Sequence, residues 1–302
     1  MELASIPGVV HVELLRGARA DVASRPDLLV EVPHGADERA HYDDYRAQMT
    51  GPLPEELEEF FFVNTDVGAY AYGRATAERV LRADPTRTAL VVRCLIPRTF
   101  IDCNRVLGDA TGGMTAAIPP YVTSAADREA LCARYDAYVA TVRAAFALVC
   151  GAGGYALVPH TYGPRTMGIE RIDDDIVKNL RWACEGDREA SWPLRPELDL
   201  ITRDDAGREL CPEHAVEMAL AAFAAAGLTA RTNETYRLSE ASLGYEWAVT
   251  YPGRVLCLEV RRDLLVDEWR ALREMSISPA KVARVAEALA VVVLGMTTPR
   301  AP

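Results

Sequence analysis

The sequence predicts an α/β protein with a mixed, mostly parallel sheet that helices cover on both faces. Short apolar segments rich in β-branched residues recur along the 302-residue chain, and longer segments with apolar residues at helical spacing separate them. Parallel strands need such crossover connections, and strands buried on both faces read as continuous apolar runs. We therefore expect a three-layer domain of helices, sheet and helices.

Composition supports one large folded unit and excludes some partners. Half of the residues are hydrophobic, which is ample material for a core, and no shift in composition marks a boundary, so we expect a single domain over residues 1–302. The net charge is −11, from 33 basic and 44 acidic residues. Nucleic-acid binding needs a basic surface, so we expect a small-molecule partner instead. The longest apolar run, 288–296, is too short to span a bilayer.

Cysteine usage indicates a reducing compartment. The chain has seven cysteines, an odd number, with no C-x-x-C pair, and most lie in apolar contexts. This pattern argues against a disulfide framework. The first 16 residues lack the basic start and apolar stretch of a signal peptide. We therefore expect a cytoplasmic protein.

The first half of the chain should supply three strands and three helices. Leu28–Pro33 is a compact apolar run that Pro33 and Gly35 bring to an end. Asn64-Thr65-Asp66 are capping residues for a helix of about 18 residues. Pro54 and the acids after it suit a helix start. The expected strands are 9–15, 28–33 and 89–92, and the expected helices begin near 54, 64 and 124.

The second half continues the alternation. A glycine-rich break at 151–154 precedes a third core strand, and Gly227 is a natural helix stop. The expected strands are 155–160, 228–232 and 254–260, and the expected helices are 173–184, 212–225 and 279–294. Residues 35–53 and the rest of 161–211 read as irregular segments, and residues 108–123 read as a surface loop.

Two strands end in the same tripeptide, Val-Pro-His, at residues 32–34 and 158–160. Open α/β sheets bind ligands at the carboxyl ends of their strands, where neighbouring strands would bring His34 and His160 together. Asp37 follows His34 by three residues, close enough for one turn to aim both side chains at a cation. Two histidines and one acid, with a position left for water, form a catalytic zinc site. The alternative for each histidine is a solvated loop residue.

Two further groups carry charge near strand ends. Arg98, Asp102, Asn104 and Arg105 fall within eight residues, a density that suits bidentate capture of a carboxylate. An exposed, salt-bridged turn is the alternative. Glu259 ends an apolar strand, where a carboxylate is costly unless it is paired or functional. A salt bridge from Glu259 to a following arginine, 261 or 262, is the alternative there.

These motifs together resemble the N-formylglutamate amidohydrolase family. Residues 98–105 resemble its R-x-x-x-D-x-N-R stretch, and residues 258–265 look like its closing E-x-x-R-x-L stretch. Residues 32–35 resemble its P-H-S-G strand end, and residues 233–236 are a looser match to its N-x-P-Y. The four motifs span about residues 28–266 in the family's order. Residues 34–37 are also similar to the H-x-x-E metal motif of the related zinc carboxypeptidases and aspartoacylase-like deacylases.

The resemblance implies a zinc-carboxypeptidase-like fold and a zinc-dependent hydrolase that cleaves the amide bond of an N-formyl or N-acyl amino acid. The implied metal ligands are His34, Asp37 and His160, with Glu38 as the alternative acid. The implied catalytic residues are the general base Glu259 and the oxyanion-stabilising Arg98. The implied substrate-binding residues are Asp102, Asn104, Arg105, Tyr236 and Arg262. The two arginine roles, of 98 and 105, can be exchanged.

The chain departs from the family pattern around the expected substrate pocket. Gly35 replaces the family's serine, Thr235 replaces its proline, and residues 237–240 replace its Gly-Gly. These departures leave the acyl group and the amino acid open. A carboxypeptidase-like metallopeptidase and a non-catalytic ligand-binding relative are the alternative functions. Manganese or iron is an alternative to zinc, because geometry and availability decide between these metals.

Overall fold

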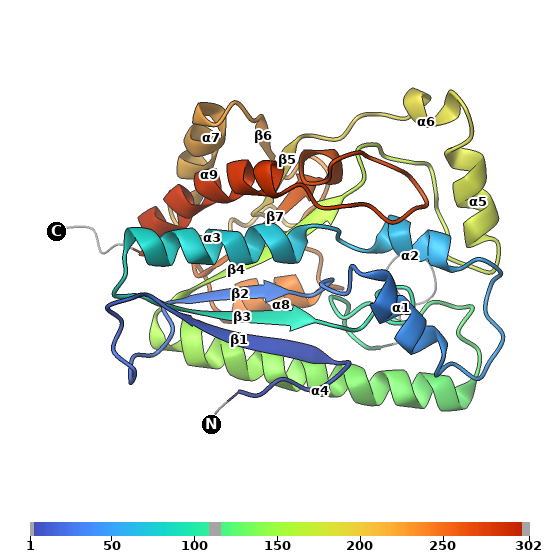
Figure 1. Cartoon of the computed structure of the whole chain (residues 1–302), viewed down its shortest axis with the longest axis horizontal. Coiled ribbons are helices and arrows are strands. Elements are labelled where there is room, and N and C mark those ends of the chain that lie inside the picture. The colour runs from blue at the N-terminus through green and yellow to red at the C-terminus, as the bar shows by residue number, and fades with distance from the viewer. Residues whose placement is uncertain (1–2, 109–115, 298–302) are drawn as a thin grey trace.

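A computed structural model describes residues 3–108 and 116–297, so 109–115 of the loop expected at 108–123 lie outside the described residues. Within that part of the chain, seven strands form one sheet in the order β1-β3-β2-β4-β7-β5-β6 (Figure 1). The strands are β1 (Val10–Arg16), β2 (Leu28–Val32), β3 (Thr88–Cys94), β4 (Tyr155–Tyr162), β5 (Leu198–Ile201), β6 (Ala230–Thr232) and β7 (Val255–Arg261).

The sheet is mixed and mostly parallel, as the alternation of elements predicted. The pairs β3–β2, β2–β4, β4–β7 and β5–β6 run parallel, whereas β1 pairs antiparallel with β3 and β5 pairs antiparallel with β7. The antiparallel pairs lie near the two edges, so the centre of the sheet is parallel. The predicted α/β fold class is confirmed.

Helices cover both faces of the sheet (Figure 1). One layer packs on the face that carries the even-numbered residues of β2, and the opposite layer packs on the other face. The first layer comprises α3 (Ala69–Ala83), α7 (Ala215–Ala225) and α9 (Pro279–Thr297), and the second comprises α4 (Ala125–Val149) and α8 (Leu243–Thr250). The shorter helices are α1 (Arg39–Arg46), α2 (Glu58–Asn64), α5 (Ile176–Ala183), α6 (Arg188–Ser191), η1 (Cys150–Ala152) and η2 (Arg262–Leu264).

Two apolar cores result, one on each side of the sheet. Successive side chains of a strand point to opposite faces, so Leu29 packs on the α4 side while Val30 packs on the α3 side. On the α4 side, the Phe146 ring stacks on the Trp247 ring with centroids 4.9 Å apart. On the α3 side, a Cβ at Gly73 would lie 2.9 Å from the Val30 side chain, so glycine permits the close approach of helix and sheet.

Besides α6, which has only four residues, the described residues include two α-helices and one strand that the sequence pattern did not predict. Helix α1 lies in the stretch that read as irregular, and its burial rests on only two tyrosines, Tyr42 and Tyr45. Strand β5 has only four residues inside a long polar segment. Helix α8 begins where the Ser242 side chain accepts a hydrogen bond from the backbone N–H of Tyr245 at 3.2 Å. Each is too short for its apolar spacing to stand out.

No described helix combines the length and the apolar character needed to cross a membrane. All seven cysteines are free thiols in the structure.

Candidate metal centre

His34 and His160 lie together near the carboxyl ends of two central strands of the sheet. Strands β2 and β4 are neighbours and run parallel, which is the pairing that the repeated Val-Pro-His predicted. Both side chains are buried, and their ring centroids are 5.2 Å apart. His34 follows the last residue of β2 by two positions, and His160 precedes the last residue of β4 by two, so β4 runs two residues past the expected end at 160. The two imidazoles still approach each other near the carboxyl ends of neighbouring strands.

Asp66 lies between the two imidazoles. Its Oδ2 atom is 3.2 Å from Nδ1 of His34 and 3.0 Å from Nδ1 of His160, and it also accepts the backbone N–H of Thr161 at 3.2 Å. Asp66 is 2 % exposed and precedes α3. One ligand atom from each of these three residues lies within 4.8 Å of the other two. We call His34, Asp66 and His160 the His-Asp-His cluster.

Asp102 contacts the second ring nitrogen of His34. Its Oδ1 atom is 2.8 Å from Nε2 of His34. A neutral imidazole has one N–H, so a proton on Nε2 that is donated to Asp102 leaves a lone pair on Nδ1, which faces Asp66. A lone pair and a carboxylate oxygen in contact need a cation between them or a second proton on the ring. Metal-binding histidines use this arrangement, with a carboxylate behind the ring fixing its tautomer and orientation.

The charged groups of the cluster shift one another's pKa values. Burial alone raises the pKa of Asp66, but His34 and His160 outweigh burial and hold that pKa well below its usual value. Burial also raises the pKa of Asp102, but Arg98 and His34 lower it further than burial raises it. Burial and Arg98 lower the pKa of His34, yet the two carboxylates together raise it above its usual value. Without a bound cation, the excess negative charge therefore favours a protonated ring.

The outer oxygen of Asp66 is an orphaned acceptor. Its Oδ1 atom is buried and accepts no hydrogen bond from any described residue. The nearest cationic atoms are Nη2 of Arg262 at 3.7 Å and Nη1 of Arg98 at 4.0 Å. Buried carboxylate oxygens without a partner are costly in free energy. Two imidazole nitrogens and a carboxylate with spare coordinating capacity fit the donor set of zinc.

Glu259 faces the cluster from the next strand. It pairs with His160 in the register of β4 and β7, so both side chains lie on the same sheet face. Burial raises the pKa of Glu259 to about 7, against smaller lowering by His160, Arg195 and Arg98. Its Oε2 atom is buried and makes no hydrogen bond to a described residue. A carboxylate with a pKa near neutrality can both accept and donate a proton there.

The segment 98–105 surrounds Asp102. The Nε atom of Arg98 donates to Asp102 Oδ2 at 2.9 Å, and Nε of Arg105 is 3.7 Å from the same oxygen. The Arg98 and Arg105 side chains are 28 % and 20 % exposed, so both reach toward solvent. Asn104 uses its Oδ1 to accept the backbone N–H of Gly244 at 3.1 Å, which joins it to α8.

Asp37 and Glu38 lie apart from the two histidines. Arg93 of β3 donates to Asp37 Oδ1 at 2.7 Å and to Glu38 Oε1 at 2.9 Å, and its Nε donates to the carbonyl of Gly35 at 2.7 Å. The guanidinium is therefore the cation that both acids bind. The spacing of His34 and Asp37 suggested a shared metal, but Asp66 occupies the place expected for that acid.

Arg262 and Tyr236, the other two expected substrate-binding residues, differ in exposure. Arg262 is 3 % exposed and donates to Thr161 Oγ1 at 3.2 Å and to the Val63 carbonyl at 2.6 Å, so it ties β4 to α2 rather than facing solvent. Tyr236 is 43 % exposed. Its loop is held by Asp199, a buried carboxylate of β5 that accepts the backbone N–H groups of residues 234 and 235.

The comparisons with known proteins show the fold. No protein-family model matches the sequence, and no curated protein matches it. The chain shares its fold with N-formylglutamate amidohydrolase from Ralstonia eutropha. That structure aligns with a TM-score of 0.59 and 16 % identity, over 96 % of this chain and 97 % of the other. A gene product from Agrobacterium tumefaciens aligns with a TM-score of 0.51 and 19 % identity, over 96 % of this chain and 94 % of the other. The resemblance that the motifs suggested therefore holds for the fold.

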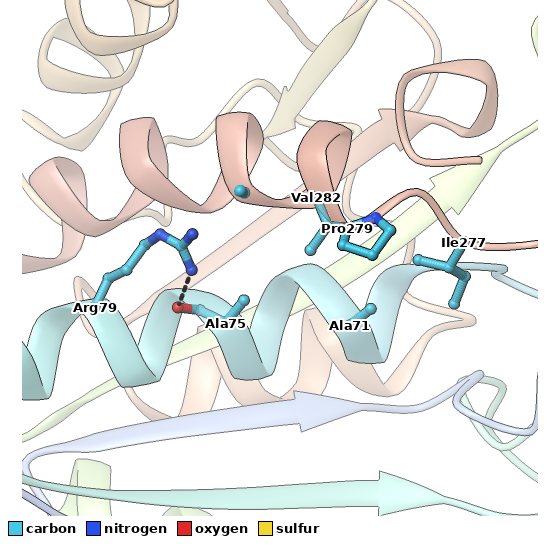
Figure 2. Close-up of a pocket in the computed structure, with 7 residues that line it drawn as sticks. Ala71, Ala75, Arg79, Ile277, Pro279 and Val282 are labelled. Carbon is cyan, nitrogen blue, oxygen red and sulfur yellow. Dashed lines mark hydrogen bonds between the residues drawn. The ribbon is translucent and has the colours of Figure 1, made fainter. Parts of the chain in front are cut away.

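One cavity of the described residues is separate from this centre. It has a volume of about 310 Å³ and lies between α3 and α9 (Figure 2). Its lining is apolar except for Arg79, whose Nη1 donates to the Ala75 carbonyl at 3.1 Å. It contains none of the histidines or carboxylates described above, so its walls offer no acid, base or metal ligand.

Asp66 is the functional candidate that sequence reasoning missed. Asn64-Thr65-Asp66 reads as a helix cap, but α3 begins at Ala69 after Gly68, which has a φ of +87°. The Asp66 side chain instead turns to the strand ends of β2 and β4. Capping and metal binding use the same residue types, so local spacing does not separate the two roles.

A second buried acid, Glu31 of β2, should make stability depend on pH. Burial raises its pKa to about 7 from 4.5, although the Tyr138 hydroxyl donates a hydrogen bond to it. The neutral carboxyl is favoured only in the folded state, so the stabilisation is complete below about pH 4.5 and is lost as pH rises through about 7. As pH rises between those limits, we expect the free energy of unfolding of Glu31→Gln to increase by about 2–3 kcal/mol relative to that of the parent.

Chemical denaturation of the metal-stripped parent and of Glu31→Gln at pH 5 and pH 8 measures this difference. Removing metal matters, because a cation near His34 and His160 would favour the charged carboxylate. An unfolding free energy with the same pH dependence in both proteins would contradict the prediction.

Proposed function

We propose that this protein is a metal-dependent amidohydrolase that cleaves the C–N bond of a small N-acyl amino acid, such as an N-formyl amino acid. One observation carries the proposal: the His-Asp-His cluster converges at the carboxyl ends of parallel strands, beside Glu259. The shared fold with an N-formylglutamate amidohydrolase supports it. We replace Asp37 by Asp66 in the proposed ligand set, because Arg93 binds Asp37.

The proposed ligands are His34 and His160 through Nδ1 and Asp66 through a carboxylate oxygen. Zinc bound there would supply a Lewis acid, and it would lower the pKa of a bound water from about 15.7 towards about 7. Asp102 would keep His34 in the tautomer whose Nδ1 is free to coordinate. Because His34 must lose a proton to bind, metal uptake should release protons and weaken as pH falls.

The proposed proton carrier is Glu259. Its burial disfavours the charged form enough to bring its pKa to about 7, which suits a group that first takes a proton from water and later gives it to the leaving amine. Burial also limits competing hydrogen bonds from solvent. Its buried Oε2 atom has no hydrogen-bond partner among the described residues, so no protein group competes for the proton there.

Arg98 is the proposed stabiliser of the oxyanion. Asp102 accepts a hydrogen bond from Nε of Arg98, and Nη1 of Arg98 lies 4.0 Å from Asp66 Oδ1. The Arg98 side chain as a whole is 28 % exposed. A preorganised positive charge acts most strongly where charge develops in the transition state. Arg105, Asn104 and Tyr236 are proposed to line the substrate side of the centre, and Arg262 to support it from behind through Thr161.

Two measurements test the proposal. Elemental analysis of the purified protein should find about one divalent metal ion per chain, and chelation followed by zinc should remove and restore activity. A panel of N-formyl amino acids, N-acetyl amino acids and dipeptides should then show amine release from the first two classes. Preference for dipeptides would favour the metallopeptidase alternative, and neither metal uptake nor turnover would refute the proposed function.

The proposed reaction suits a cytoplasmic enzyme with a small-molecule substrate. Free thiols at all seven cysteines fit a reducing compartment.

A further inference from the structure

Arg195 is an arginine at the edge of the proposed centre that the motifs did not indicate. It lies in the segment between α6 and β5. Its backbone N–H donates to the Pro164 carbonyl at 2.9 Å, and its Nε donates to Thr166 Oγ1 at 3.1 Å. These bonds fix both ends of the residue, so the position of its guanidinium is defined by the fold.

Two tyrosine rings flank that guanidinium. Its central carbon lies 5.1 Å from the ring centroid of Tyr162 and 5.7 Å from that of Tyr236. Contacts of this length are attractive, because the face of an aromatic ring is negative. Tyr162 is buried and its hydroxyl donates to the Pro196 carbonyl at 2.7 Å, so this part of the support is rigid.

This arrangement lies next to the His-Asp-His cluster. Tyr162 follows His160 by two residues in β4, so the two side chains lie on the same face of the sheet. Glu259 is opposite His160 in the register of β4 and β7, on that same face. The contact with Tyr162 therefore places Arg195 beside the strand that carries His160.

Arg195 differs from the other arginines of the centre in its partners. Arg98 and Arg105 both face Asp102, and buried Arg262 bonds to Thr161 and Val63. Within residues 3–108 and 116–297, Arg195 makes no ion pair, and of its side-chain nitrogens only Nε has a hydrogen-bond acceptor. Its two terminal nitrogens are thus available for a bidentate contact with a carboxylate.

We propose that Arg195 is a specificity-determining residue that binds a carboxylate of the substrate, with Tyr162 and Tyr236 holding the plane of its guanidinium. This inference rests on the proposed function. Arg195 then binds the carboxylate in place of Asn104 and Arg105. The Oδ1 atom of Asn104 already accepts a hydrogen bond from Gly244, and Arg105 faces Asp102. The exposed Tyr236 then closes the outer side of the anion site.

Kinetics of Arg195→Gln test the inference with three matched compounds: N-formylglutamate, N-formylglutamine and N-formylisoglutamine. The last two each replace one carboxylate of the first by a neutral amide. For N-formylglutamate we expect KM to rise about 10- to 100-fold with kcat within a few-fold, which is the range for losing a charged, bidentate hydrogen bond. One of the two amides lacks the carboxylate that Arg195 binds, and on that compound the parent and Arg195→Gln should have equal kcat/KM. Arg195→Lys should recover part of the loss.

Arg171→Gln is the matched control, because it removes an exposed arginine from the same long segment. Isothermal titration with the three compounds gives the same comparison without turnover, so it tests Arg195 even where the proposed reaction fails. An inactive, metal-free parent would refute the proposed function alone. Equal losses on all three compounds, or no loss on any, would refute the role of Arg195.

Discussion

Glu259→Gln should lower kcat by about 10²–10⁴ while the protein keeps its metal ion. Glutamine has nearly the same shape but carries no titratable proton, so it cannot accept a proton from water or deliver one to the leaving amine. The proposed ligands belong to other residues, and Glu259 makes no hydrogen bond to any of them. Steady-state kinetics and elemental analysis of the same preparation measure the two quantities.

Glu274→Gln is the control for this variant, since Glu274 is exposed and lies outside the centre. The control should keep parental kcat and metal content. Turnover of Glu259→Gln within threefold of the parent would exclude it as the proton carrier. Loss of the metal from Glu259→Gln would instead assign this carboxylate to the ligand set.

Asp66→Asn should abolish activity and weaken metal binding by at least about 100-fold. Losing a residue that only supports a ligand typically costs 10- to 100-fold in metal affinity, and a direct ligand should cost more. The variant should also be less stable, because His34 and Arg262 would lose the buried carboxylate that faces them. Competition with a chromophoric chelator measures the affinity, and thermal melting followed by circular dichroism measures the stability.

Asp37→Asn is the matched comparison for Asp66→Asn. Both substitutions replace a carboxylate whose side chain is at most 5 % exposed, but Asp37 is paired with Arg93 and Asp66 lies between the histidines. Asp37→Asn should therefore retain metal stoichiometry. If instead Asp37→Asn lost the metal and Asp66→Asn kept it, the ligand set suggested by the local spacing would be restored.

One departure from the family motifs has a structural reason. A Cβ at position 35 would lie 2.5 Å from Cγ of Arg93 and 3.0 Å from the carbonyl oxygen of Cys94. The guanidinium of Arg93 reaches past this point to Asp37 and Glu38. Glycine at 35 and arginine at 93 are therefore coupled, because a larger residue at 35 would displace the side chain that fixes the loop after His34.

The sequence by itself determined the fold class and the position of the two histidines. Apolar runs and helical spacing are local signals, and they predicted the central strands and the long helices. The repeated Val-Pro-His added one long-range statement, because identical strand ends on neighbouring parallel strands must meet at one edge. The structure confirms that β2 and β4 are those neighbours.

Only the tertiary structure decided which acid joins the histidines. Asp66 is separated by 32 residues from His34 and by 94 residues from His160, so no local pattern links the three. Asp37 has the better spacing, but Arg93 from the adjacent strand binds it. The approach of Arg195 to Tyr162 and Tyr236 depends in the same way on loops meeting across the sheet. Residue types and spacing describe what a segment can bind, whereas the packing of distant segments decides which partner it contacts.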